Sequence, residues 1–223
     1  MRRKHFFYKQ KKHNFDFFKN NFMKKFILIL LFCTSFASFA QFEKFNVTGK
    51  FGMAGASEPS ISTFSNLGLL FKVNYNEYWG STIGWDREKF VNEIDDTKGT
   101  VSNRFTLQMV ANMTNLLDEN SDNYNEYFNL YMHAGFGFAT MKPLSGESGA
   151  DKIGNLVLGI NPQYIITEGF NVGIDGSLIL NNSQHMAFHT GESISKGDLQ
   201  VNNFQKIIYN ICLTLTYSFG ELR

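Results

Sequence analysis

Apolar and polar residues alternate with a period of two through most of the chain after residue 44, most clearly in the last segment. One face there carries Ile207, Tyr209, Ile211, Leu213, Leu215, Tyr217 and Phe219, and the other carries Asn210, Cys212, Thr214, Thr216 and Ser218, with only Ile208 out of step. This alternation predicts a β-strand with one apolar and one polar face. At about 3.3 Å per residue and a tilt near 45°, such a strand spans roughly 30 Å, the hydrocarbon thickness of a bilayer.

The same alternation recurs in earlier segments, at 45–53, 66–75, 79–86, 104–114, 128–138, 155–164 and 170–181. The sequence therefore predicts an all-β protein with eight antiparallel strands. Pro162 falls on the apolar parity of the sixth segment, which predicts a bulge or a local lapse in pairing. An even number of strands suits a closed barrel with both chain ends on one side.

The predicted connections alternate in length. Short turns fall at 75–77 and 167–169 and an intermediate connection at 116–125, whereas the long loops run over 55–65, 87–99, 141–152 and 182–201. Short periplasmic turns and long extracellular loops are typical of outer-membrane β-barrels.

Alternation alone does not say which face points outward, because a soluble eight-stranded barrel with an apolar ligand inside, such as a lipocalin, has the same period. The polar face here holds mostly Gly, Asn, Thr, Ser and Gln with a few isolated charges, whereas the water-facing side of a soluble barrel is rich in Lys and Glu. The apolar face carries no charge in any of the predicted segments. This composition favours lipid outside and a crowded polar lumen inside.

Aromatic residues gather at both ends of the predicted strands. Near the short turns lie Phe45, Tyr75, Trp79, Phe128, Tyr164, Phe170, Tyr217 and Phe219, and near the long loops lie Trp85, Phe105, Phe136 and Phe138. Two aromatic girdles are typical of the two membrane interfaces. The alternative explanation is the general preference of aromatic residues for strands.

The N-terminal region predicts export. Lys24 and Lys25 precede the apolar run 26–32, and small residues at Ser38 and Ala40 occupy the positions that a signal peptidase reads. We expect a signal peptide at 23–40, a mature barrel at 41–223, and an upstream leader at 1–22 that is not part of the mature protein. The alternative is an uncleaved anchor, although the apolar run is short for a spanning helix. Only Cys212 remains after cleavage, so no intrachain disulfide is expected.

A few titratable residues occupy the alternate strand positions that are predicted to face the lumen. They are Lys50, Lys72, Asp86, Arg104, His133 and Asp175. Charges in a narrow interior persist only when they are paired or hydrated. Asp86 and Arg104 lie on adjacent strands toward the long-loop end, so we predict that they pair, while Lys50, Lys72 and Asp175 are candidates to bridge the lumen. Eight strands enclose a space about wide enough for side chains alone. The sequence thus predicts a plugged lumen; the alternative is the selectivity filter of a narrow, porin-like channel for small solutes.

The signal peptide, the eight alternating strands, the alternating loop lengths and the aromatic-rich last strand resemble the OmpA-type outer-membrane β-barrel family, within the porin-like superfamily. The resemblance covers 41–219 and implies outer-membrane localisation, contact with outer-membrane lipids and with the barrel-insertion machinery, and surface loops that meet an extracellular ligand. In two respects the sequence departs from the family: 220–223 follow Phe219, where members often end on an aromatic residue, and no peptidoglycan-binding domain follows the barrel.

Catalytic chemistry is weakly represented. The serine that lipid-modifying barrel enzymes place near a histidine is absent, because Gly135 stands two positions after His133. His185, His189, Glu192 and Ser193 form a polar loop cluster that suits acid-base or metal chemistry but is more often solvated. We expect no enzyme activity, no cofactor, no metal and no nucleic-acid partner, and a structural or surface-interaction role.

Overall fold

The computed structural model describes residues 44–57, 61–92, 94–117, 127–146, 149–182, 184–188, 190–192 and 206–220. All of them belong to one compact unit, Phe42–Arg223. The predicted leader at 1–22 and signal peptide at 23–40 lie outside the described residues and remain predictions.

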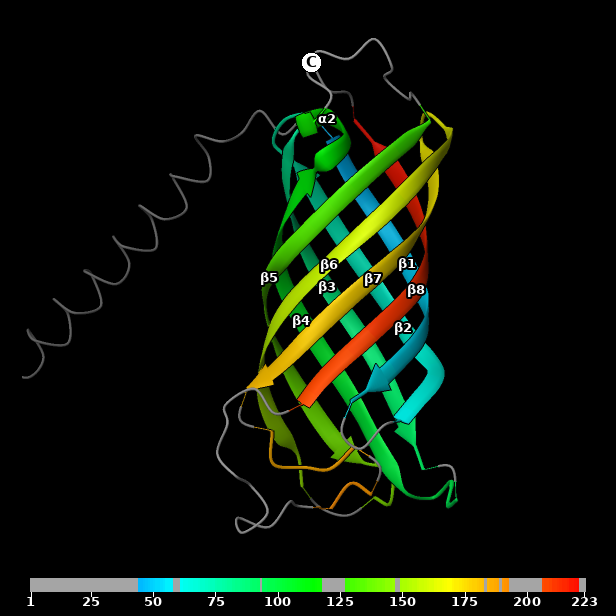
Figure 1. The fold of residues 1–223 in the computed structure, drawn as a ribbon, viewed down its shortest axis with the longest axis vertical. Helices are drawn as coiled ribbons and strands as arrows, with labels where there is room; N and C mark the ends of the chain where they lie inside the picture. Colours follow the sequence, from blue (N-terminus) through cyan, green and yellow to red (C-terminus); the bar gives the residue numbers. More distant parts are fainter. Residues whose placement is uncertain are drawn as a thin grey trace, which may run out of the picture. The chain divides into compact units, whose positions relative to one another are not determined.

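Eight antiparallel strands form one closed barrel, in which each strand pairs with its neighbours in sequence and β8 pairs with β1 (Figure 1). The strands are β1 (Lys44–Ala56), β2 (Ile61–Asn74), β3 (Trp79–Val91), β4 (Gly99–Asn112), β5 (Phe128–Pro143), β6 (Asp151–Thr167), β7 (Phe170–Asn182) and β8 (Lys206–Phe219). The predicted fold class is confirmed. The predicted lapse at Pro162 is also present, because the β6–β7 pairing skips from Ile160 to Gln163.

The strands are strongly tilted, and the pairing register shows by how much. Following paired residues once around the barrel from Phe45 leads back to β1 at Gly55, ten residues further along. A shear of this size in an eight-stranded barrel requires a strand tilt of about 40°. Both ends of the barrel's chain, Lys44 and Phe219, lie with the short turns at one end, and the long loops lie at the other.

Several predicted boundaries were wrong, and the strands are longer at the long-loop end. β3 continues to Val91, because Glu88 and Phe90 keep the inward parity while Arg87 and Lys89 keep the outward one. The predicted loop at 87–99 therefore shrinks to 92–98. The charged residues on both faces of this extension hid the alternation.

A second boundary error lies at the other end of β4. Met113, predicted to lie in a strand, begins the short helix α2 (Met113–Leu117). The Asn112 side chain accepts a hydrogen bond from the Asn115 backbone N–H at 3.4 Å, as an N-cap residue does. No helix within the described ranges is long and apolar enough to cross a membrane.

The two faces of the barrel reverse the usual arrangement of a soluble protein. Large apolar side chains are exposed on the outer surface, including Phe136 at 66 %, Phe105 at 59 % and Ile83 at 61 %. Polar side chains are buried inside, among them Asn46, Thr48, Gln108, Thr214 and Thr216. Water is a poor solvent for such an outer surface, so the barrel requires a lipid environment.

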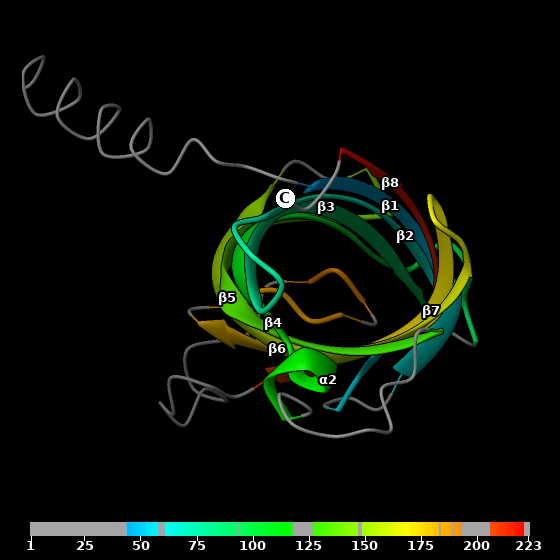
Figure 2. The same ribbon diagram turned by 90° about the horizontal axis from the view of Figure 1, so that it is seen from above.

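The interior is not polar throughout. At the long-loop end, inward positions of the strands and two loop residues form an apolar cluster, called here the apolar plug: Ala54, Ala56, Ile61, Phe90, Ala139, Met141, Ile153, Val157, Ile179, Met186, Phe188 and Ile208. Ile208, which is out of step in the sequence pattern, is one of its members. Figure 2 shows the segment around Met186 and Phe188, in orange, crossing the ring of strands.

Candidate functional site

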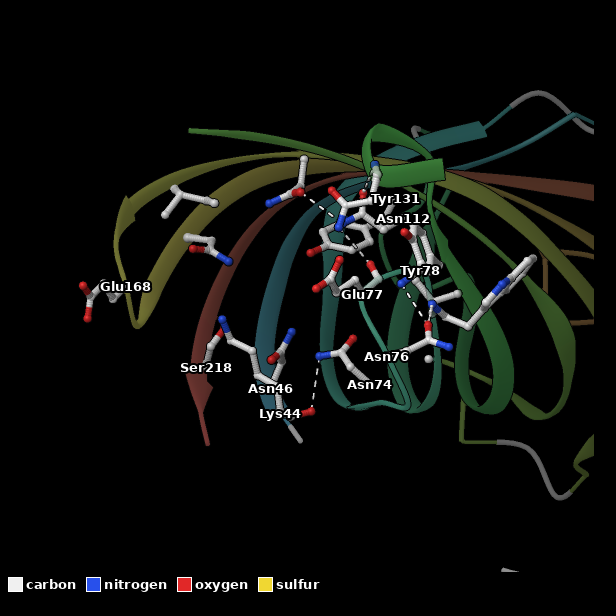
Figure 3. A pocket seen from close by; sticks show the side chains of 17 residues that line it. Lys44, Asn46, Asn74, Asn76, Glu77, Tyr78, Asn112, Tyr131, Glu168 and Ser218 are labelled. Atoms are coloured by element: carbon white, nitrogen blue, oxygen red, sulfur yellow. Dashed lines mark hydrogen bonds between the residues drawn. The ribbon is translucent and has the colours of Figure 1, made fainter. Parts of the chain in front are cut away.

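A polar vestibule opens at the short-turn end of the lumen (Figure 3). Its volume is about 330 Å³, and its lining is rich in amides: Asn46, Asn74, Asn76, Asn112, Asn115, Asn129 and Asn171. Lys44, Glu77, Tyr78, Tyr131 and Glu168 also line it. Several amides hold one another or the turns, as Asn112 does by donating to the Asn129 Oδ1 at 3.0 Å. The vestibule is therefore a hydrophilic entrance.

Deeper in the lumen lies a cavity of about 40 Å³, large enough for a small number of water molecules. Tyr131 and Val110 line both this cavity and the vestibule. The Lys72 ammonium sits 3.7 Å from the centre of the Tyr131 ring, a cation–π contact. Among the described residues Lys72 has no carboxylate partner, and its contact with another strand is the one with Tyr131 of β5.

Lys50 lines this cavity, and its ammonium lies between two carboxylates. It is 2.9 Å from the Asp86 Oδ1 and 3.7 Å from the Asp175 Oδ1. Asp175 also faces the His133 Nε2 at 3.0 Å and accepts a hydrogen bond from the Ser177 hydroxyl at 2.6 Å. Because these groups come from β1, β3, β5 and β7, their contacts connect strands on opposite sides of the lumen.

Arg104 pairs with a residue that the sequence prediction missed. Its Nη2 lies 2.5 Å from the Glu88 Oε2, and Asn210 donates to the Glu88 Oε1 at 2.8 Å. The predicted Asp86–Arg104 pair is wrong: the two residues are cross-strand neighbours, but Asp86 turns toward Lys50 and Arg104 toward Glu88. The continuing inward parity of β3 was the signal that pointed to Glu88.

The seven residues Lys50, Lys72, Asp86, Glu88, Arg104, His133 and Asp175 are called here the central network. Without His133, it contains three cations and three carboxylates, so its formal charges balance. Two glycines make room for it. A Cβ at Gly68 would collide with the Asp86 carboxylate and the Lys50 chain, and one at Gly159 would collide with the His133 ring.

Of the predicted loop cluster, the structure describes His185 and Glu192, while His189 and Ser193 lie outside the described residues. The Asp151 carboxylate accepts hydrogen bonds from the backbone N–H groups of His185 and Met186, at 2.5 and 3.0 Å. The His185 ring is 65 % exposed and 3.3 Å from Asp151. Asp151 thus holds the loop against the barrel mouth, and among the described residues no set of three His, Cys, Asp or Glu side chains is close enough to bind a metal.

The predicted girdle residues lie on the outer surface. At the short-turn end the pairing places Phe45 beside Phe219, Phe128 beside Tyr164, and Phe170 beside Tyr217. Trp79 is 45 % exposed at the same end. At the long-loop end Trp85 is paired with Phe105, which is paired with Phe138.

Comparison with known proteins finds matches among solved structures only, since no family model and no curated protein matches the chain. Neisserial surface protein A matches with a TM-score of 0.54 at 10 % identity, over 79 % of this chain and 96 % of that one. The chain has the fold of the small outer-membrane β-barrels. The N-terminal β-barrel domain of OprF from Pseudomonas aeruginosa (TM-score 0.47, 10 % identity, 79 % and 98 % covered) and the attachment invasion locus protein Ail of Yersinia pestis (0.46, 15 %, 79 % and 99 %) are also similar.

In this fold the apolar outer band lies in the lipid, the short turns lie on the periplasmic side and the long loops lie outside. The vestibule therefore opens toward the periplasm, and the apolar plug lies toward the extracellular end.

Proposed function

We propose that the protein is a non-conducting outer-membrane barrel with a structural and surface-interaction role. The observation that carries this proposal is the apolar plug, in which the Phe90 and Phe188 rings lie 4.9 Å apart and are fully buried. The Thr100 hydroxyl donates to the Phe188 carbonyl at 3.2 Å and anchors the loop there. A hydrated path for ions cannot pass a dry apolar cluster without moving it.

The central network supports the same conclusion. Arg104 and Glu88 adjoin the plug, since Arg104 pairs with Ala139 and Glu88 precedes Phe90 by two residues, and they are 1 % and 0 % exposed. Buried charges held in pairs need both partners, since removing one leaves an uncompensated charge. The network thus acts as a polar brace between strands and not as a filter along a pore.

The surface-interaction part of the proposal rests on the strands that extend beyond the outer girdle. β3 continues six residues past Trp85 and β4 begins six residues before Phe105, so this hairpin projects rigidly from the membrane. Ile94, in the connecting turn, is 97 % exposed. An apolar side chain held in water on a rigid hairpin suits contact with another surface.

Conductance of the purified barrel in planar lipid bilayers tests the closed lumen. We expect no steady single-channel currents from the wild type, with a known porin in the same bilayer as the positive control. Steady currents that change when Arg104 is replaced by Ala would contradict the proposal and favour a narrow channel.

A complementation experiment separates the structural role from surface contact. In cells that lack the gene, both the wild type and Ile94→Ser are expected to restore detergent resistance, because this substitution leaves the barrel intact. Only the wild type is expected to restore adhesion or cell–cell aggregation. If Ile94→Ser restores adhesion as well as the wild type does, the tip of the β3–β4 hairpin is not the contact surface.

A further inference from the structure

Four basic residues lie together on the outer surface at the long-loop end. Arg87 and Lys89 on β3, Lys142 on β5 and Lys152 on β6 are all exposed. We call them the cationic belt. None of the four forms an ion pair with any residue in the described part of the chain.

The pairing register shows how close the four residues are. Lys89 is opposite Val101, which is opposite Lys142. Arg87 is opposite Asn103, then Thr140, then Lys152. With strands about 4.8 Å apart and about 3.3 Å per residue, the belt covers roughly 15 Å by 7 Å. No carboxylate lies among these outward positions.

The belt begins where the aromatic girdle ends. Trp85 lies two residues nearer the middle of β3 than Arg87. Phe138 lies two residues nearer the middle of β5 than Thr140, which is paired with Lys152. Each further pair of residues advances about 5 Å along the membrane normal at a tilt of 40°. The headgroup layer is about 5 to 8 Å deep on each side of a bilayer. The four cations therefore lie at headgroup level and just beyond it.

The opposite half of the barrel lacks such charges. The described outward side chains of β7, β8, β1 and β2 at this end are apolar or neutral: Leu178, Leu180, Asn182, Ile207, Tyr209, Met53, Ser62 and Phe64. A general need for basic residues at a membrane interface would distribute them around the whole barrel. The one-sided arrangement indicates a specific ligand.

We propose that the cationic belt binds the phosphate groups of phosphorylated glycolipids in the outer leaflet, of the lipid A type. Phosphate carries the complementary charge, and guanidinium and ammonium groups are its usual protein ligands. The belt is wide enough to meet two phosphates of one headgroup, and the apolar surface beneath it, with Phe105 and Phe138, contacts the acyl chains. Lipid binding at this face also fixes the orientation of the projecting β3–β4 hairpin.

Tryptophan fluorescence offers a local reporter, because Trp79 and Trp85 are the two tryptophans of the chain and Trp85 adjoins Arg87. In a Trp79→Phe background, the refolded barrel in detergent micelles is titrated with bisphosphorylated lipid A and with the same lipid after dephosphorylation. We expect about tenfold tighter binding of the phosphorylated form. Equal affinity for the two forms would overturn the proposal.

Two charge-matched double variants test the location. K89Q/K142Q removes two belt charges, whereas K44Q/K98Q removes two charges from outside the belt. We expect the first to lose most of the preference for phosphate and the second to keep it; equal loss in both would mean unspecific attraction and overturn the belt. Folding of each variant is checked by heat-modifiable gel mobility.

If K89Q/K142Q does not fold, two measurements on the protein with an intact belt still test the proposal. Lipid A binding is expected to weaken as salt rises, because the belt is exposed to solvent. Inorganic phosphate at millimolar concentration is expected to compete poorly, since it lacks the acyl chains. Salt-independent binding, or full displacement by inorganic phosphate, would count against a lipid ligand.

Discussion

The two ends of the barrel interior are built on the same strands but from different chemistry. At the short-turn end the inward positions carry asparagines around an open vestibule. At the long-loop end the inward positions carry Ala, Ile, Met and Phe, and Met186 and Phe188 of the following loop pack against them. The central network lies between the two.

This difference shows that the alternation along a strand decides which side chains face inward. It does not decide whether those side chains are polar or apolar. Where water enters, amides keep their hydrogen-bonding groups satisfied by the solvent and by one another. Where a loop excludes water, the interior follows the rules of a soluble core, and close packing of apolar side chains stabilises it. The buried ion pairs lie between the hydrated, amide-lined region and the apolar, packed region.

Truncating the plug is expected to have the largest effect on stability. Each Phe→Ala replacement in a packed core costs about 3 to 5 kcal/mol, and the two rings touch, so Phe90→Ala with Phe188→Ala is expected to cost more than either alone but less than the sum. Urea unfolding of the barrel in phospholipid vesicles, followed by gel mobility, measures the free energy of unfolding.

The matched control lies at the other end. Tyr78→Ala removes an aromatic ring that lines the open vestibule and is only partly buried. We expect a cost of about 1 kcal/mol or less, because water fills the space that the ring leaves. Similar losses at both ends would mean that the plug is not a packed core.

Breaking the ion pair beneath the plug is expected to have the next largest effect. Glu88→Gln leaves the Arg104 guanidinium buried without a carboxylate, at a cost of about 3 kcal/mol in the free energy of unfolding. Replacing both residues, as in E88M/R104M, is expected to recover most of that loss, because an apolar pair of similar volume extends the plug downward. A double variant less stable than Glu88→Gln would show that the pair itself stabilises the barrel.

The barrel was predictable because alternation with a period of two is a local property of the sequence. The strand number and the alternating loop lengths follow from it, and the composition of the two faces identified the outer one. The plug was less visible, since Ile153, Val157, Ile179 and Ile208 interrupt the polar parity one residue at a time, on different strands. Only the closed register brings them together.

The partners of the central network could not be predicted from strand adjacency. Asp86 and Arg104 are direct cross-strand neighbours, yet each turns to another residue. The lumen is narrow, so a long side chain reaches strands across the barrel as easily as the adjacent one, and Lys50 on β1 meets Asp175 on β7. Which contact forms depends on side-chain packing, including the space left by Gly68.

The smallest expected effect is a pH-dependent change in one loop turn, which can be compared with a turn at the other end of the barrel. In the long-loop turn between β3 and β4, the Asp95 carboxylate accepts a hydrogen bond from the Thr97 hydroxyl at 2.6 Å and another from the Thr97 backbone N–H at 3.1 Å. In the short turn between β2 and β3, the Asn76 side-chain oxygen accepts from the backbone N–H groups of Tyr78 and Trp79, at 2.9 and 2.8 Å. In both turns one side-chain oxygen accepts two hydrogen bonds from residues two or three positions later, but only in the first turn is the accepting side chain ionisable.

Two hydrogen bonds lower the pKa of Asp95 below the usual value for an aspartate. The bond from the Thr97 hydroxyl has the larger effect and the bond from the Thr97 backbone N–H the smaller one. A lowered folded-state pKa means that these bonds stabilise the turn above the ordinary pKa and are lost as the pH falls through the lowered one. In an NMR titration of the folded barrel, the Thr97 amide shift is therefore expected to change in the acid range, while the Trp79 amide, which donates to Asn76, is expected to change less. Thr97→Val is expected to move the Asp95 titration back toward its ordinary range, whereas a Trp79 amide that shifts as much as that of Thr97 would contradict the difference between the two turns.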